Sequence, residues 1–144
     1  MNKLLILNGP NLNLLGSREP DIYGSENFDT YLEGLRNRYF GLEIVYYQTN
    51  IEGEIVDYLQ KSDTDDQLGG VVLNAGAYSH TSIAIADAIL AITKPVVVVH
   101  ISNVYSREIE RRTDLLLGAA VGSIAGLGLS GYELALRYLM SNLK

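Results

Sequence analysis

Short apolar runs alternate along the chain with longer segments in which apolar residues recur at helical spacing. The clearest runs are residues 4–7, 44–47, 71–73 and 96–99, and a fifth at 120–124 lies in a glycine-rich stretch. Runs that are almost continuously apolar are typical of parallel strands covered on both faces. The pattern therefore predicts five strands of a parallel sheet.

Four segments have the spacing of helices, namely 28–39, 55–59, 83–92 and 130–138. The third is apolar all round except for Asp87, which predicts a buried helix. Asp87 either faces solvent or pairs at an interface, and its apolar helix favours the interface because an unpaired buried charge is costly. In the fourth, Ser130 and Glu133 match a capping box, so we expect the helix to start at Ser130 with this cap.

Five strands alternating with helices in 144 residues predict an α/β fold. We expect a flavodoxin-like three-layer sandwich with a five-stranded parallel sheet. No repeat, linker or low-complexity tract interrupts residues 1–144, so we expect a single flavodoxin-like domain. Hydrophobic residues make up 47% of the chain and charged residues 19%, which indicates a packed core and not disorder.

Charge and composition exclude several classes of protein. The net charge of −6 is opposite in sign to the basic footprint that nucleic-acid binding requires. The absence of cysteine removes disulfides, thiolate metal sites and cysteine nucleophiles. The apolar run near the N-terminus is too short for a signal peptide or a membrane span. We therefore expect a cytoplasmic protein with no nucleic-acid or membrane partner.

Polar residues follow three predicted strands at the point where each strand ends. They are Asn-Gly-Pro-Asn at 8–11, Asn-Ala-Gly at 74–76 and His-Ile-Ser-Asn at 100–103. Ligands of doubly wound sheets bind beyond the carboxyl ends of the strands, so we expect a pocket there. No glycine-rich phosphate fingerprint is present, so a nucleotide cofactor is not expected.

Two histidines and a cluster of arginines are candidate site residues with alternative interpretations. His80 and His100, the only histidines, both fall near strand ends, where each is either a structural group or part of a site. No third ligand recurs at metal-like spacing, so no metal site is predicted. Arg107, Arg111 and Arg112 form either a solvated helix face or a site for a carboxylate or hydroxyls.

The long stretch between the first predicted strand and the first predicted helix contains Arg18 and Tyr23. Loops of this length are often lids. A tyrosine is a poor base at neutral pH unless nearby cations stabilise its phenolate, and Arg18 is the local candidate for such a cation. The alternative is that Tyr23 only anchors the loop by packing.

Four blocks of the sequence resemble the type II 3-dehydroquinate dehydratases. These are residues 8–16, 18–24, 74–82 and 100–108. They occur in the family's order and spacing, and the resemblance extends over nearly the whole chain. It implies a cofactor-free hydro-lyase that converts 3-dehydroquinate into 3-dehydroshikimate by trans elimination of water through an enolate.

The same resemblance implies a catalytic role for four residues. Tyr23 would remove a proton as a tyrosinate, with Arg18 lowering its pKa. Asn11 would hold a water that stabilises the enolate oxygen, and His100 would act as general acid on the departing hydroxyl.

Substrate-binding roles are implied for six further residues. The substrate's ring hydroxyls and carboxylate would be bound by Asn74, His80, Arg111, Ile101 and Ser102, the last two through their backbone and the Ser102 hydroxyl. Asp87 would reach into the site from a neighbouring subunit, because the family forms a homododecamer built from trimers.

One departure from the family concerns the general acid. The family usually has a glutamate two residues before the catalytic histidine, and this chain has Val98. Residues two apart on a strand face the same side, so the substitution removes a partner that would orient His100. Glu110 and Asp114 also depart from the family pattern, and the sequence does not show whether either one reaches His100.

Two other functions remain to be compared with an active dehydratase. Val98 is compatible with a non-catalytic or weakly active paralogue that only binds dehydroquinate. A flavodoxin-like FMN-binding or receiver module would need a phosphate-binding loop or an acidic phosphoacceptor cluster, and residues 8–11 supply neither.

Overall fold

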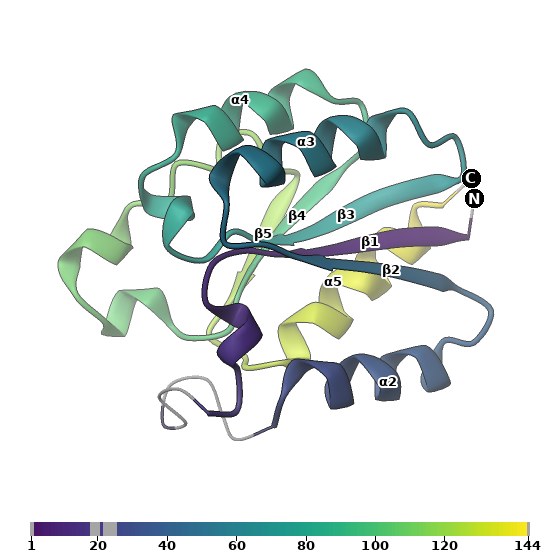
Figure 1. Cartoon of the computed structure of the whole chain (residues 1–144), viewed down its shortest axis with the longest axis horizontal. Coiled ribbons are helices and arrows are strands. Elements are labelled where there is room, and N and C mark those ends of the chain that lie inside the picture. The colour runs from purple at the N-terminus through teal and green to yellow at the C-terminus, as the bar shows by residue number, and fades with distance from the viewer. Residues whose placement is uncertain (1, 18–20, 22–25, 144) are drawn as a thin grey trace.

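The computed structural model describes residues 2–17, 21 and 26–143 (Figure 1). These residues form a sheet of five parallel strands in the order β2-β1-β3-β4-β5. The strands are β1 (Lys3–Asn8), β2 (Glu43–Gln48), β3 (Leu68–Asn74), β4 (Val96–His100) and β5 (Gly122–Ala125). This is the flavodoxin-like strand order, so the predicted parallel sheet is confirmed.

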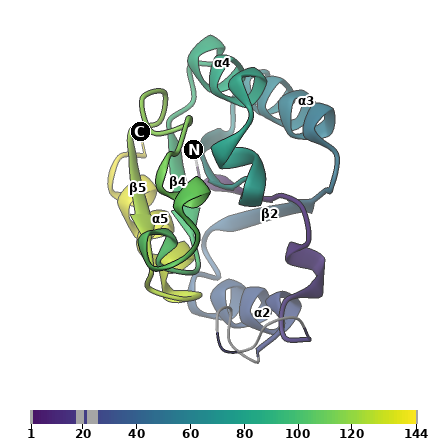
Figure 2. The same ribbon diagram turned by 90° about the vertical axis from the view of Figure 1, so that its left-hand side faces the viewer.

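Helices cover both faces of the sheet, as Figures 1 and 2 show from two sides. The helices are α2 (Phe28–Arg38), α3 (Glu52–Asp63), α4 (Ile83–Ala91) and α5 (Ser130–Ser141). Helices α3 and α4 lie on one face, and α2 and α5 lie on the other, which confirms the three-layer sandwich. Within the described residues, no helix combines the length and apolarity needed to cross a membrane.

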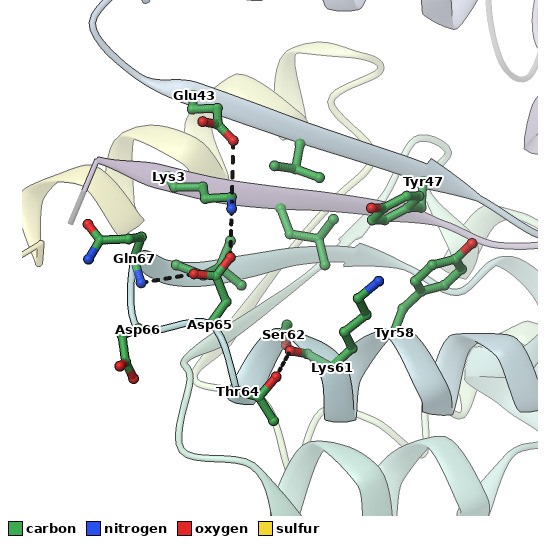
Figure 3. Close-up of a pocket in the computed structure, with 13 residues that line it drawn as sticks. Lys3, Glu43, Tyr47, Tyr58, Lys61, Ser62, Thr64, Asp65, Asp66 and Gln67 are labelled. Atoms are coloured by element: carbon green, nitrogen blue, oxygen red, sulfur yellow. Dashed lines mark hydrogen bonds and ion pairs between the residues drawn. The ribbon is translucent and has the colours of Figure 1, made fainter.

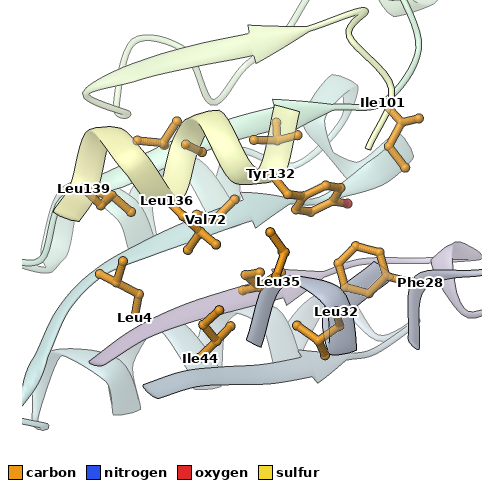
Figure 4. Packing of buried hydrophobic residues seen from close by; sticks show 14 of the residues in the cluster. Leu4, Phe28, Leu32, Leu35, Ile44, Val72, Ile101, Tyr132, Leu136 and Leu139 are labelled. Atoms are coloured by element: carbon orange, nitrogen blue, oxygen red, sulfur yellow. The ribbon is translucent and has the colours of Figure 1, made fainter. Parts of the chain in front are cut away.

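The core consists of two apolar clusters, one on each face of the sheet. Successive strand residues point to opposite faces, so Leu4 and Ile6 pack towards α2 and α5, whereas Leu5 and Leu7 pack towards α3 and α4. Figure 4 shows the first cluster, with Tyr132 of α5 at its end. Burial on both faces explains why β1, β3 and β4 are almost continuously apolar in the sequence.

Two helices differ from their predictions. Helix α5 begins at Ser130 as expected, but its N-cap residue is Leu129 and no side chain caps it. Glu133 accepts hydrogen bonds from Tyr39 Oη at 2.6 Å and from Arg38 Nη2 at 3.1 Å. The predicted capping box is therefore wrong, because α2 supplies the partners of Glu133.

Helix α4, which was expected to be buried, is buried on only one face in the single chain. One face packs into the core through residues such as Ile85 and Ile89. The opposite face is open, with 67% of Ile83 and 67% of Leu90 exposed, and Asp87 is also exposed. A layered sheet buries only one side of a covering helix, which leaves this apolar face uncovered.

A buried tyrosine joins the ends of two neighbouring strands, β1 and β3. The hydroxyl of Tyr132 donates to Asn8 Oδ1 at 2.7 Å and accepts from Asn74 Nδ2 at 2.8 Å. All three side chains are buried, and burial strongly raises the pKa of Tyr132. The hydroxyl thus satisfies one polar atom on each of two buried side-chain amides, the Asn8 oxygen and the Asn74 nitrogen.

Replacing Tyr132 by phenylalanine should lower the free energy of unfolding by about 1–3 kcal/mol, because Asn8 and Asn74 each lose a buried partner. Urea denaturation at fixed protein concentration measures the change. Tyr138→Phe is the matched control, since Tyr138 is half exposed on the same helix. Equal stability of the two variants would show that the bridge contributes nothing.

Candidate active site

A pocket opens at the carboxyl ends of β1, β3 and β4, where the sheet order predicts a ligand. Seven residues predicted from the sequence line it: Asn11, Asn74, His80, His100, Ile101, Ser102 and Arg111. Tyr23 and Arg18 lie outside the described residues. The expected convergence of polar strand ends is thus found for the described candidates, with the exception of Asp87.

Gly9 and Asn11 determine the conformation of the loop after β1. A side chain at Gly9 would place its Cβ 2.8 Å from the backbone C and O of Ala75, so only glycine lets the loops after β1 and β3 approach so closely. Asn11 has a φ of 68°, a left-handed conformation that asparagine tolerates better than most residues. The backbone N–H of Asn11 donates to Asn50 Oδ1 at 3.0 Å, which fixes Asn11 at the rim of the pocket.

Asn74 serves both the fold and the pocket. Its Oδ1 accepts from the amide of Gly76 at 3.1 Å, and its Nδ2 donates to Tyr132. A side-chain amide carries two N–H donors, so one remains for a ligand in the pocket.

The end of β4 presents backbone donors to the pocket. The carbonyls of His100 and Ile101 accept from the amides of Gly126 and Gly128 at 3.2 and 3.0 Å. The amides of Ile101 and Ser102 donate to no acceptor within the described part of the chain. Neighbouring amides without acceptors are suited to binding an anion.

Two arginines add positive charge beside these amides. Arg107 Nη1 donates to Ser102 Oγ at 3.3 Å, and Arg111 Nε donates to Glu108 Oε1 at 2.5 Å. The hydrogen bond from Arg111 is the main cause that lowers the pKa of Glu108. Both guanidinium groups line the pocket, where they can bind a carboxylate or hydroxyls.

The two histidines lie side by side on the pocket wall, with ring centroids 5.8 Å apart and an interplanar angle of 17°. His80 Nδ1 is 2.6 Å from the carbonyl oxygen of Thr113. His100 Nε2 is 2.7 Å from Asp114 Oδ2, and both of these side chains are more than 90% buried. The sequence left open whether Glu110 or Asp114 reaches His100 in place of the family's glutamate, and in the structure Asp114 does.

Comparison with known proteins identifies the family. The model of the class II dehydroquinases matches residues 2–140. The chain belongs to this family. It is 47% identical to the 3-dehydroquinate dehydratase of Carboxydothermus hydrogenoformans, over 99% of this chain and 92% of that protein. It is 46% identical to the enzyme of the same name from Caldicellulosiruptor saccharolyticus, over 94% of each chain.

A solved structure supports the same assignment. The type II dehydroquinase of Propionibacterium acnes superposes with a TM-score of 0.91 at 42% identity, covering 98% of this chain and 97% of that one. The fold is therefore that of the type II dehydroquinases.

Two residues that shape this dehydroquinase pocket were not among the predicted site residues. Tyr132 holds Asn74 from the layer behind the sheet. The signal that could have revealed it is the pair of asparagines at the ends of β1 and β3, since buried amides require partners. Asp114 was one of two candidate acids, and the structure selects it over the exposed Glu110.

A larger pocket lies away from this site, between α3 and the face of β1 and β2 (Figure 3). Lys3 is paired with two acids there, since its Nζ is 2.6 Å from Asp65 Oδ2 and 3.7 Å from Glu43 Oε2. The rings of Tyr47 and Tyr58 stack at one end, 4.4 Å apart. Among the described residues, no histidine or arginine lines this pocket, in contrast to the one at the strand ends.

Metal-binding side chains do not gather in the described residues. No three His, Asp or Glu side chains there lie close enough together to hold a metal ion. The pocket at the strand ends contains hydrogen-bond donors and acid–base groups instead.

Proposed function

We propose that the chain is a 3-dehydroquinate dehydratase that eliminates water from 3-dehydroquinate to give 3-dehydroshikimate. One observation carries the proposal, namely that imidazoles, arginines and unpaired amides meet in the pocket of a class II dehydroquinase. Relatives at 46–47% identity bear the name 3-dehydroquinate dehydratase. An FMN-binding or receiver function is not favoured, because this pocket lacks the phosphate loop or acidic cluster that either would need.

Binding of the substrate is assigned to the donors at the strand ends. The carboxylate lies on the amides of Ile101 and Ser102 and on the Ser102 hydroxyl. Arg111, Asn74 and His80 bind the ring hydroxyls. For His80, the Thr113 carbonyl accepts the hydrogen on Nδ1, so Nε2 is left to meet a hydroxyl.

The elimination divides into two proton transfers. Tyr23, as a tyrosinate stabilised by Arg18, takes a proton from C2 and forms the enolate. Asn11 holds the water that stabilises the enolate oxygen. His100 then gives a proton to the C1 hydroxyl, which leaves as water while the C1–C2 double bond forms. Transfer of one proton from Tyr23 to His100 resets the enzyme.

The direct test is an ultraviolet assay for the conjugated enone of 3-dehydroshikimate, with purified protein, EDTA and 3-dehydroquinate. Wild-type protein should turn over steadily. Tyr23→Phe should lower kcat by about 100-fold or more, because the base is lost with almost no change in volume. Tyr105→Phe, at an exposed tyrosine, is the matched control.

Two outcomes of this assay would contradict the proposal. Folded wild-type protein that binds a substrate analogue without turnover would indicate the non-catalytic paralogue. Normal turnover by Tyr23→Phe would remove the tyrosinate from the mechanism but not the activity itself.

The location, domain organisation and pathway that we propose are those expected from the sequence. We place the enzyme in the cytoplasm, with residues 1–144 as one catalytic domain. It serves either the shikimate pathway, which leads to the aromatic amino acids, or quinate breakdown, because both use this reaction.

The exposed face of α4 supports an assembly of several copies. Ile83 and Leu90 leave apolar surface uncovered there, and Asp87 lies exposed on the same helix. We propose that another copy covers this face and that Asp87 enters the neighbour's pocket, in a homododecamer built from trimers. Asp87 is then both an interface residue and a substrate-binding residue.

Size-exclusion chromatography with light scattering tests the assembly. Wild-type protein should have the mass of a dodecamer, and Leu90→Glu should lower that mass because it puts a charge into an apolar contact. Phe40→Glu is the control, since Phe40 is 92% exposed elsewhere. Asp87→Asn should keep the mass of the dodecamer and raise KM for 3-dehydroquinate. An unchanged mass for Leu90→Glu would show that α4 is not the interface.

A further inference from the structure

The partner of the catalytic histidine comes from a loop and not from the histidine's own strand. We propose that Asp114 is the positioning residue for His100 and replaces the glutamate that the family usually has at the position of Val98. This inference rests on the proposed dehydratase function. It identifies the group that orients the general acid, and it identifies the ring nitrogen that delivers the proton.

The carboxylate of Asp114 is held at both oxygens. Oδ2 accepts from His100 Nε2 at 2.7 Å, and Oδ1 accepts from the amide of Leu116 at 2.9 Å. The segment itself is attached to the pocket wall, because the amide of Leu115 donates to the carbonyl of Ser79 at 2.8 Å. A carboxylate fixed in this way can hold an imidazole in one orientation.

The same segment explains why Val98 is apolar. Val98 and Leu116 are both fully buried and belong to the apolar cluster under α3 and α4. A glutamate at position 98 would place a charge in this cluster, which is costly without a partner. Leu116 thus belongs to the same core as Val98, and Asp114, two residues earlier, brings the carboxylate to His100 from outside the sheet.

The contact determines which nitrogen of His100 reacts. A carboxylate only accepts hydrogen bonds, so Nε2 carries the hydrogen that points to Asp114. No described residue forms a hydrogen bond with Nδ1 of His100. When the ring is charged, Nδ1–H is therefore the proton available to the departing hydroxyl. His80 has the opposite arrangement, because its Nδ1–H points to the carbonyl of Thr113.

Nitrogen-15 NMR of the imidazoles tests these assignments without reference to turnover. The chain has only two histidines, so a His80→Gln variant assigns both sets of signals. In the neutral state of the full-length wild-type protein, His100 should be the Nε2–H tautomer and His80 the Nδ1–H tautomer. An Nδ1–H tautomer for His100 would overturn the proposal, whether or not any variant folds.

The variant that isolates the role is Asp114→Asn, which keeps the shape and an oxygen for the amide of Leu116. Its NH₂ group then faces Nε2, and a donor facing a donor should switch His100 to the Nδ1–H tautomer. We expect kcat to fall by about 100-fold or more with KM changed less than about threefold, since lost orienting partners typically cost this much or more. The His80 signals should stay unchanged and report a folded site.

The matched control is Glu110→Gln, which removes an exposed acid from the same region. It should leave kcat and both tautomers as in the wild type. A normal kcat for Asp114→Asn, or an equal loss in Glu110→Gln, would overturn the proposal. Absence of turnover in the wild-type protein would instead refute the dehydratase function, and the NMR result would still decide whether Asp114 orients His100.

Discussion

This structure depends on one constraint, namely that the buried polar groups at the strand ends need hydrogen-bond partners. Asn8 and Asn74 end the neighbouring strands β1 and β3 inside the protein, and the hydroxyl of Tyr132 bonds to both. The bridge links α5 to the sheet at the point where the pocket begins. It also orients Asn74, so that one amide donor is left for a ligand. The packing of the layer behind the sheet therefore fixes part of the binding site in front of it.

The pocket concentrates positive charge and donors in a chain whose net charge is −6. Two acids balance the basic groups, each from the loop after β4: Glu108 bonds to Arg111, and Asp114 bonds to His100. Within the described residues, this division leaves the amides of Ile101 and Ser102 without acceptors. Local arrangement, and not total charge, decides what such a site binds.

Periodicity in the sequence predicted the sheet, its parallel direction and the convergence of the polar strand ends, because burial on both faces leaves a direct pattern. The capping box failed because Glu133 finds partners on α2, a contact between distant segments. The bond from Asp114 to His100 was also beyond prediction. It depends on the path of an irregular loop, which has no period from which to derive it.

The most direct measurement is a crystal structure of the protein with an unreactive analogue of 3-dehydroquinate. The carboxylate should lie on the amides of Ile101 and Ser102, with the C1 substituent at Nδ1 of His100 while Nε2 stays on Asp114. An analogue bound between α3 and β2, or a His100 ring turned away from Asp114, would contradict the account.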